Sequence, residues 1–496
     1  MEDHSRRLRS HQSQKKKSIE KTNDRISELP DAVLHYILSM MPMKFIVRTS
    51  ILSRRWRDLW KPIWAYSTSL DFGAEFTTGQ TREAFVATVN LYLQLHKGKE
   101  IQMLRFSFIP CNLPDAEKWI EFAVAKRVKE LHIDFGQTIY FIAFKPEPYE
   151  LLNSIFNCDS ITYLNLSRCD FCLPLDFKGY TYLKKLHLSF VRVTDALFES
   201  MLANCPLLEE LSLRDCRRLT RVKVSAPDLP LKSLTVVDCW DAREIEIFAP
   251  NLRSFRFYGS FIHISFKNIS SLVDVLVNGI CRRGYERDLH WITVLCRLEH
   301  VKILTLCNVS LEYIGLAEQY RREELPITFR NLQELQLLMN WYAGGSLAST
   351  YSFFKNCPCP RLEKLFIELP SANEDPSQRD YQWERLRTNS LPIMFDHLKV
   401  IKMNGFRGLK DEMLLVKFFL EKAIVLESLV LVAPQEGVFN MKKDSASESK
   451  SVNRLRKLLL TLAKVSSSDA QILVSESSED DGALAPTHLE VYHRKG

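Results

Sequence analysis

Two close cysteine pairs are the residues whose spacing most suggests chemistry. Cys169 and Cys172 lie three positions apart, and Cys357 and Cys359 lie two positions apart. Thiolates at such spacing can bind zinc, but a structural zinc site needs four Cys or His ligands, usually as two pairs. Neither pair is followed by a second Cys or His pair at zinc spacing. The twelve cysteines are therefore predicted to be free thiols in a reducing compartment, and no metal ligand is assigned.

Sequence motifs for catalysis are missing as well. The chain has only 16 glycines and no Gly-rich phosphate loop, and neither G-x-S-x-G nor H-E-x-x-H occurs. Four histidines have no Cys, Ser or carboxylate partner at a familiar catalytic spacing: His4, His11, His35 and His132. We therefore expect no catalytic residues, no cofactor and no enzymatic activity in this chain.

Basic and aromatic residues alternate in one short stretch, a pattern that could bind nucleic acid. The stretch contains Arg54, Arg55, Trp56, Arg57 and Trp60. Its cations could contact phosphates and its rings could stack on bases. In the alternative interpretation, both tryptophans pack inward and the arginines are solvated. A net charge of +7 is small for 57.7 kDa, so nucleic acid is not the partner that we favour.

The composition is that of an ordinary globular chain, with 46% hydrophobic and 26% charged residues among 496. No apolar run approaches the roughly 18 residues that a membrane span needs. The first twenty residues are charged and polar and contain no secretory apolar region. We expect the protein in the nucleus, the cytoplasm or both, without membrane association. The cluster Lys15–Lys17 fits either a weak nuclear-import signal or a solvated arm.

From about residue 100 to 435 the sequence repeats one short apolar string. In each copy an apolar residue is followed by two others, a second apolar residue, one other and a third apolar residue. The middle apolar positions are Leu104, Leu131, Leu164, Leu186, Leu211, Leu234, Phe255, Val275, Leu304, Leu335, Leu365, Ile401 and Leu429. Their mean separation of about 27 residues lies within the period of leucine-rich repeats, about 20–29.

Each string predicts a short strand that presents its last two apolar residues to one face of a sheet. Between strings lie segments such as Thr194–Asn204, in which Leu197 and Met201 have helical spacing. The pattern predicts an α/β fold, an irregular solenoid with parallel strands inside and helices and loops outside. In this order the strand of Leu211 lies between those of Leu186 and Leu234. The steps vary from 20 to 36 residues, so the longer ones must contain inserted loops.

Several cysteines occupy one fixed position of this repeat. Three residues after the last apolar anchor, leucine-rich repeats favour Asn or Cys, whose side chain bonds backbone groups of the turn. That position holds Cys169, Cys216, Cys239 and Asn340. These cysteines are therefore predicted to be buried, reduced and free of metal, each just beyond its strand.

Residues 24–64 are compact, rich in aromatic residues and predicted to form three short helices. The first begins at Leu29-Pro30-Asp31 and carries one wide apolar face. That face consists of Val33, Leu34, Ile37 and Leu38. A second helix is predicted from Met43 to Leu52 with Phe45, Ile46 and Val47 inward. A third, capped by Ser53, carries Trp56, Leu59 and Trp60 and ends before Pro62. Because forty residues bury little surface, part of the apolar face is expected to be an interface.

This segment closely resembles an F-box. The resemblance rests on Leu29-Pro30, Ile37-Leu38, Pro42, Val47, Ser50, Leu52-Ser53, Arg55-Trp56 and Leu59-Trp60. It implies binding to a Skp1-like adaptor and, through it, to a cullin. The adaptor-binding residues that the resemblance implies are Leu29, Pro30, Val33, Leu34, Ile37, Leu38, Pro42, Val47, Ser50, Leu52, Trp56, Leu59 and Trp60.

A second resemblance lies near the C-terminus. Its matching residues are Phe395, Leu398, Gly405, Gly408, Glu412, Phe418–Leu420 and Leu426-Glu427. Together they look like the FBD module that follows leucine-rich repeats in many plant F-box proteins. From the residues alone, we predict a strand over Leu398–Met403, a glycine-bearing turn, a helix over Lys410–Ala423 and a strand over Ser428–Leu431.

The predicted organisation has five parts. They are a disordered basic arm (1–23), an F-box (24–64), a repeat array (65–370), FBD-like closing repeats (371–434), and a last part of linker, short helix Asn453–Lys464 and disordered acidic tail (435–496). The resemblance implies the substrate-recognition subunit of an SCF-type ubiquitin ligase, or else a Skp1-binding scaffold that is not coupled to degradation. No target-binding residue is assigned, and a small molecule in the concave face of the array stays open.

Overall fold

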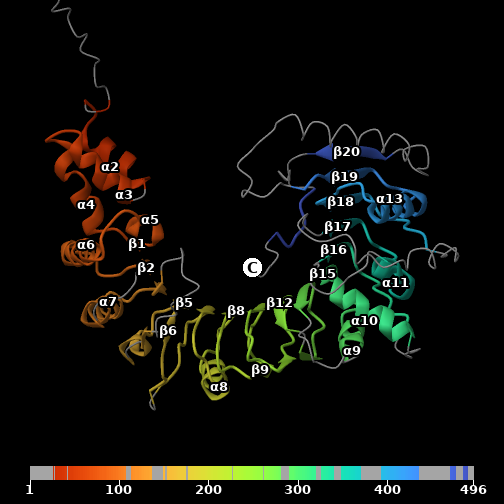
Figure 1. Ribbon diagram of the computed structural model, residues 1–496. Coiled ribbons are helices and arrows are strands. Elements are labelled where there is room, and N and C mark those ends of the chain that lie inside the picture. The colour runs from red at the N-terminus through yellow and green to blue at the C-terminus, as the bar shows by residue number, and fades with distance from the viewer. Residues whose placement is uncertain are drawn as a thin grey trace, which may run out of the picture.

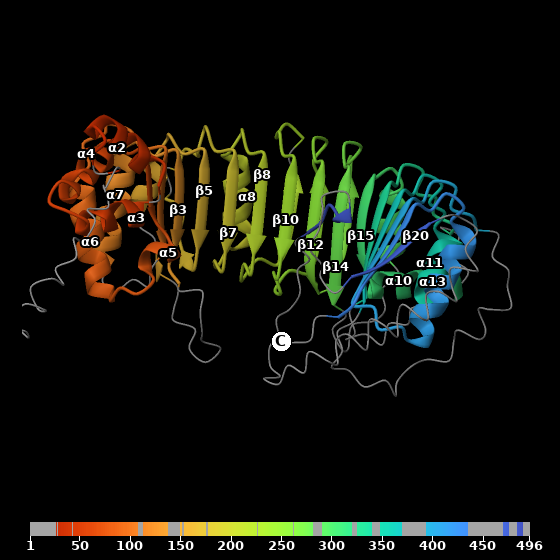
Figure 2. The same ribbon diagram turned by 90° about the horizontal axis from the view of Figure 1, so that it is seen from above.

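One long parallel sheet lines the inner side of an open arch (Figure 1). Helices gather at the N-terminal end and on the outer side of the sheet, as the view from above also shows (Figure 2). The computed structural model describes residues 26, 28–41, 43–107, 113–136, 149–150, 153–174, 177–225, 227–260, 262–280, 290–319, 325–339, 348–369, 393–434, 470–475 and 484–489.

The sheet has fifteen strands among the described residues, and all of its neighbours are parallel and follow chain order. In order they are β1 (Ser69–Phe72), β2 (Met103–Ser107), β3 (Glu130–Asp134), β5 (Tyr163–Ser167), β7 (Lys185–Ser189), β8 (Glu210–Arg214), β10 (Ser233–Val237), β12 (Ser254–Ser260), β14 (Asp274–Ile280), β15 (Ile303–Cys307), β16 (Glu334–Leu338), β17 (Lys364–Glu368), β18 (Val400–Asn404), β19 (Ser428–Val432) and β20 (Gln471–Ser475). All thirteen predicted strings form strands, from β2 to β19. The predicted solenoid is confirmed.

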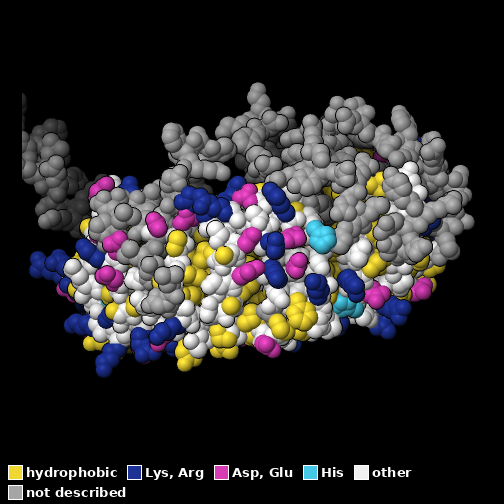
Figure 3. Space-filling model, turned by 90° about the horizontal axis from the view of Figure 1, so that it is seen from below, with side chains coloured by type: hydrophobic (Ala, Val, Ile, Leu, Met, Phe, Trp, Pro, Cys, Tyr) yellow, Lys and Arg dark blue, Asp and Glu magenta, His cyan; other side chains and the backbone are white. Residues whose placement is uncertain are grey.

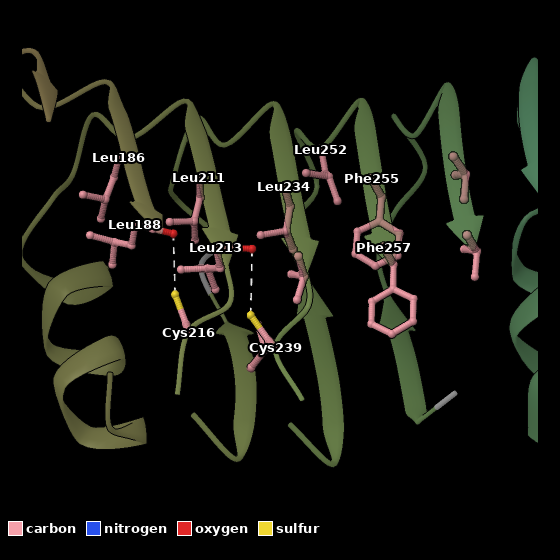
Figure 4. Packing of buried hydrophobic residues seen from close by; sticks show 14 of the residues in the cluster. Leu186, Leu188, Leu211, Leu213, Cys216, Leu234, Cys239, Leu252, Phe255 and Phe257 are labelled. Atoms are coloured by element: carbon pink, nitrogen blue, oxygen red, sulfur yellow. Dashed lines mark hydrogen bonds between the residues drawn. The ribbon is translucent and has the colours of Figure 1, made fainter. Parts of the chain in front are cut away.

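The register explains why the strings must stack. Leu211 of β8 pairs with Leu186 of β7 on one side and with Leu234 of β10 on the other, so the predicted order of these strands is confirmed. These leucines and the second anchors of each strand, such as Leu213, point into a continuous core and are almost completely buried (Figure 4). Burying one such side chain stabilises the fold by roughly 1.5–3 kcal/mol. The two end strands of the sheet, β1 and β20, each have a paired neighbour on one side only.

Among the described residues, helices cover the outer side in most of the longer steps between strands. They are α5 (Ala74–Thr77), α6 (Arg82–Leu95), α7 (Leu113–Ala125), η3 (Asn153–Asn157), α8 (Asp195–Ala203), α9 (His290–Arg297), α10 (Asn308–Gln319), α11 (Ala348–Asn356) and α13 (Lys410–Lys422). The predicted helix over Thr194–Asn204 is confirmed as α8, which Thr194 caps by accepting a hydrogen bond from the N–H of Leu197 at 3.3 Å.

Between β8 and β14 the outer layer is a second sheet, not helices as elsewhere. Its parallel strands are β9 (Arg221–Ser225), β11 (Glu244–Phe248) and β13 (His263–Lys267), in the order β13-β11-β9. The steps here are only 20–23 residues, too short for a helix with its two connections. Charged side chains of both signs are mixed on this convex side (Figure 3), where Arg221 pairs with Glu244 at 2.5 Å.

Two further strands were not among the predicted strings. Residues 69–72 form β1, so the sheet begins about thirty residues before the first predicted string. Residues 471–475 form β20, which pairs with β19 although the tail was predicted to be disordered. The run Ile472-Leu473-Val474 is β-forming and marks this strand in an otherwise polar segment. A short ladder of β4 (Tyr149–Glu150) and β6 (Cys169–Asp170) completes the described sheets.

Some predictions lie outside the described residues: the arm 1–23, the turn residue Asn340 of the repeat, the polar break 371–390, the linker 435–452 and the helix Asn453–Lys464. In the part of the chain that is described, no helix has the length and apolar character to cross a bilayer. The described ranges also contain no group of three or more His, Cys, Asp or Glu placed to hold a metal ion.

The cysteine positions of the repeat are confirmed. Cys169, Cys216 and Cys239 are buried and lie just beyond β5, β8 and β10. The thiol of Cys216 points to the carbonyl oxygen of Leu188 at 3.6 Å, and that of Cys239 to Leu213 at 3.8 Å (Figure 4). Each thiol therefore bonds the backbone of the preceding repeat and keeps adjacent turns in step.

These thiols should react far more slowly than exposed ones. Burial raises the pKa of Cys169 well above its usual range and that of Cys205 to about 11, whereas Cys172 is exposed. Only the thiolate is nucleophilic, and two pKa units leave about a hundredfold less of it. Iodoacetamide labelling of the native protein, read by peptide mass spectrometry, should modify Cys172 at least about a hundredfold faster than Cys205. Equal rates would show that the segment around Cys205 opens readily.

Candidate functional site

The N-terminal module, residues 24–64, consists of short helices around a small core. They are α2 (Asp31–Ser39), α3 (Met43–Arg48), η1 (Thr49–Ile51), η2 (Trp56–Asp58) and α4 (Trp60–Ala65). Pro30 precedes α2 directly, where its missing N–H is not needed. The guanidinium of Arg55 donates to the carboxylate of Asp31 at 2.6 Å and to the carbonyl oxygen of Leu29 at 2.5 Å. This contact fixes the start of α2 against the third helical segment.

Two predicted features of this module are corrected. The second helix ends at Arg48 and continues as a 3-10 turn, and its Phe45 is exposed instead of facing inward. The third helix does not stop before Pro62 but runs through it from Trp60 to Ala65. Proline is tolerated there because the N–H groups of the first helical turn have no intrahelical acceptor.

Helix α2 is apolar on two adjacent sides. Leu34 and Leu38 point into the core and are buried. Val33 and Ile37, four residues apart on another side, are 40% and 37% exposed, and Met40 continues this stripe at 68%. Tyr36 of the same helix and Phe45 of α3 are exposed as well. We call Val33, Tyr36, Ile37, Met40 and Phe45 the apolar stripe.

The structure thus divides the predicted adaptor-binding residues. Buried inside the module are Leu34, Leu38, Trp56, Leu59 and Trp60. These five support the fold of the module, and their assignment as adaptor contacts stays a prediction. At least partly accessible are Leu29, Pro30, Val33, Ile37, Val47, Ser50 and Leu52, and Pro42 lies outside the described residues. Tyr36, Met40 and Phe45 were missed, although Tyr36 and Met40 lie three residues from Val33 and Ile37 respectively, a helical spacing that marks them.

Aromatic side chains attach the module to the first repeat. The indole N–H of Trp64 donates to the carbonyl oxygen of Tyr92 in α6 at 2.7 Å. The ring of Tyr92 lies 4.8 Å from that of Trp64 and 5.5 Å from that of Trp60. Since Trp56 and Trp60 are buried, their rings cannot stack on bases, which removes the geometric basis of the nucleic-acid interpretation. The module and the array share one core.

A second candidate surface is the inner face of the sheet near its N-terminal end. In each strand the residues between the apolar anchors point to this concave side. The register aligns Arg105, His132, Asn165 and His187 in one row across β2, β3, β5 and β7. The parallel row contains Tyr163, Lys185 and Glu210. We call these seven residues the polar ladder.

Hydrogen bonds connect the centre of the polar ladder. His187 contacts Tyr163 through Nδ1 at 2.9 Å and Glu210 through Nε2 at 2.9 Å. Lys185 pairs with the other oxygen of Glu210 at 3.0 Å. Burial would raise the pKa of Glu210, but hydrogen bonds from Lys185 and His187 hold it below its ordinary value. Burial also raises the pKa of the Tyr163 phenol. The ladder therefore offers an ordered set of donors, acceptors and one carboxylate to a polar partner.

Comparison with known proteins decides the family. Residues 26–64 match the F-box domain, and residues 92–477 match a family described as the At1g61320/AtMIF1 LRR domain. The chain belongs to this F-box/leucine-rich-repeat family. F-box domains in general bind Skp1-type adaptors, so the apolar stripe lies on the domain that serves this contact in the family.

Relatives from Arabidopsis thaliana cover most of the chain. FBD-associated F-box protein At1g61320 is 26% identical over 88% of this chain and 94% of its own length. F-box/FBD/LRR-repeat protein At1g78750 is 27% identical over 88% and 94%, and F-box/FBD/LRR-repeat protein At1g13570 is 24% identical over 82% and 91%. All three names contain both F-box and FBD, the two resemblances found in the sequence.

The FBD-like segment forms an elongated repeat, but it does not close the array as predicted, because β20 pairs beyond its last strand β19. The predicted strand, turn, helix and strand are confirmed as β18, the glycines at 405 and 408, α13 and β19. Gly405 has a φ of 75°, and a Cβ there would lie 3.1 Å from the carbonyl oxygen of Leu369, so the turn needs glycine. The buried carboxylate of Glu412 accepts hydrogen bonds from the N–H groups of Arg407 and Leu409 at 2.8 and 3.1 Å, which caps α13.

His132 of the polar ladder makes folding stability depend on pH. Burial and the charge of Arg105 lower its pKa from 6.5 to about 4. Above pH 6.5 neither state is protonated, whereas between 6.5 and 4 only the unfolded chain binds the proton. Stability is therefore lost as pH falls through this window, by roughly 2 kcal/mol between pH 7 and 5.

The measurement is urea unfolding of the native chain and of a His132→Gln variant at pH 7 and pH 5. Carboxylates and the remaining histidines contribute equally to both proteins, so the variant should lose about 2 kcal/mol less on acidification. If both proteins lose the same amount, His132 is protonated in the folded chain.

Proposed function

We propose that this protein is the substrate-recognition subunit of an SCF-type ubiquitin ligase. Its F-box binds a Skp1-like adaptor, through which it reaches a cullin, and its repeat array binds a target protein. The observation that supports this most is the exposed apolar stripe of α2 and α3 inside the F-box. Clustered exposed apolar side chains on a soluble chain indicate a protein partner.

The shape of α2 explains how one helix serves both the fold and a partner. Leu34 and Leu38 hold it to the module core, and the adjacent side with Val33 and Ile37 stays free to be covered by another chain. Covering Val33 and Ile37 would add apolar burial that a module of forty residues cannot supply from within. The partner that fits is a groove lined by apolar residues, as a helix-binding surface requires.

The contribution of such a subunit is proximity, with no bond chemistry of its own. A target bound to the array would be held at a fixed distance from the adaptor, because Trp60 and Trp64 join the F-box and the first repeat in one core. Holding a reactant in place replaces the encounter of two free molecules. We therefore propose a non-catalytic role without a cofactor, in the nucleus, the cytoplasm or both.

For the target we propose the polar ladder as one contact surface. Lys185 is exposed and His187 is half-buried, and both are held by Glu210 before any partner binds. Side chains fixed in advance lose little entropy on binding, which favours a specific contact. The ladder lies among the first repeats, on the same end of the array as the F-box.

The adaptor contact is tested with Ile37→Glu in the full chain. The variant lacks the apolar side chain that the adaptor would bury, and its charged carboxylate must be desolvated on binding. Affinity for a Skp1-type adaptor should therefore fall by about a hundredfold, roughly 3 kcal/mol. Titration calorimetry with the purified adaptor measures this.

Leu91→Glu is the matched control, since Leu91 is also half-exposed on a helix but lies in α6 outside the F-box. It should bind the adaptor as the unmodified chain does, and circular dichroism should show both variants folded. Unchanged binding of Ile37→Glu would contradict the proposed adaptor site.

The same variant, used as bait in cells, distinguishes binding of a target from its ubiquitination and degradation. Ile37→Glu should retain the proteins that bind the array, because the array folds on its own contacts, but should not promote their ubiquitination. With the proteasome blocked, mass spectrometry should find shared partners that carry ubiquitin only with the unmodified bait. If neddylation inhibition leaves the level of every shared partner unchanged, the protein is a Skp1-binding scaffold instead.

A further inference from the structure

The concave face changes character along its length. On β2, β5 and β7 the residues between the anchors are accessible to solvent: Arg105 is exposed and His187 is partly exposed. In the same register row, Leu276 and Thr305 are fully buried and Gln336 is nearly so. Polar side chains on the open side of a sheet become buried where neighbouring side chains or another segment cover them. On β14, β15 and β16 part of that cover comes from the described segment 484–489.

This segment touches three successive strands. The N–H of Thr487 donates to the carboxylate of Glu334 in β16 at 2.6 Å. The Nδ1 atom of His488 lies 2.7 Å from the hydroxyl of Thr305 in β15, and its Nε2 atom lies 3.5 Å from the carboxylate of Asp274 in β14. Figure 1 shows the C-terminal part of the chain returning to the inner side of the sheet. The contacts join residues more than 150 positions apart.

The polar groups around the imidazole are arranged in a directed chain. Thr305 donates its hydroxyl hydrogen to the amide oxygen of Gln336 at 3.1 Å, so Nδ1 of His488 must carry the hydrogen that Thr305 accepts. On the other side Ser254 donates to Asp274 at 2.6 Å. Thr305, Gln336 and Glu334 are all buried, and unpaired buried polar groups are costly. The strands thus provide a prepared acceptor for an imidazole and an acceptor for one backbone N–H.

His488 is the single buried anchor of the segment. It is 1% exposed, whereas Thr487 and Leu489 on either side are exposed. The segment also lies beyond residue 477, where the match to the repeat family ends. It is therefore a short peptide that binds through one side chain and one N–H, in the manner of a ligand and not of another repeat.

We propose that the concave face over β14, β15 and β16 is a binding site for an extended peptide segment that carries a histidine, and that residues 487–488 occupy it within the same chain. A target that binds here presents an imidazole N–H to Thr305 and the preceding backbone N–H to Glu334, and it displaces the chain's own segment. This site would be part of the target-binding surface, and the role of the target rests on the proposed function.

The test uses the full chain with His488→Ala and a fluorescent peptide of the sequence Gly482–Val491. A tethered ligand competes at an effective concentration of about 1 mM, so a peptide with an intrinsic Kd of about 0.1 mM gains about tenfold in affinity when the tether loses its anchor. Fluorescence anisotropy should show this gain over the unmodified chain. The same peptide with alanine at the histidine position should not bind.

Two hydroxyl deletions locate the peptide on the sheet. Thr305→Val, added to His488→Ala, should abolish the gain because it removes the hydroxyl that accepts from the imidazole. Thr235→Val is the matched control: Thr235 of β10 lies in the same register row, three strands from Thr305, and its loss should leave peptide binding unchanged.

A second variant distinguishes loss of the histidine anchor from a defect in folding. Thr487→Pro keeps His488 but removes the N–H that donates a hydrogen bond to Glu334, so it should also raise peptide affinity. Its far-ultraviolet circular dichroism spectrum should be unchanged. Equal peptide affinity for the unmodified chain and both variants, or binding that does not need the histidine, overturns the proposal. Because neither the adaptor nor the target is in the assay, this failure is distinct from a failure of the proposed ligase role.

Discussion

The stacking of apolar anchors from strand to strand is the constraint on which the rest of the structure depends. Leu186, Leu211 and Leu234 are buried because each is covered by the strands beside it and by the outer layer behind it. No repeat could bury these side chains alone. The chain must therefore continue the stack from β1 to β20, and the turn cysteines, which bond the backbone of the preceding repeat, keep successive turns aligned.

Each strand of this sheet also carries residues that do not contribute to the core. Because alternate side chains point away from the core, every repeat places a few side chains on the concave face. Near the F-box these positions form the polar ladder around His187 and Glu210. Farther along, Thr305 and Glu334 are satisfied by the segment that contains His488. One regular sheet thus carries an open polar surface and one that the chain itself covers.

The repeat array could be predicted well from the sequence, and the F-box surface only in part. All thirteen strings became strands because their period places two apolar residues on one face wherever the strand lies. In the F-box, the apolar residues of α2 belong to two sides: Leu34 faces the core, while Ile37 faces solvent. Hydrophobicity alone cannot separate a core contact from an interface contact, since both need apolar side chains. Phe45 was assigned to the core for the same reason.

By itself the sequence determined the strand order, the family resemblance and the positions of the turn cysteines, since each depends on local spacing along the chain. The tertiary structure alone decided which side of α2 is free and which strands meet His488. The contact of His488 with Thr305 spans 183 residues, and no local pattern records such a pairing. It depends on the fold of the whole sheet, whose strands β14, β15 and β16 meet the described segment 484–489.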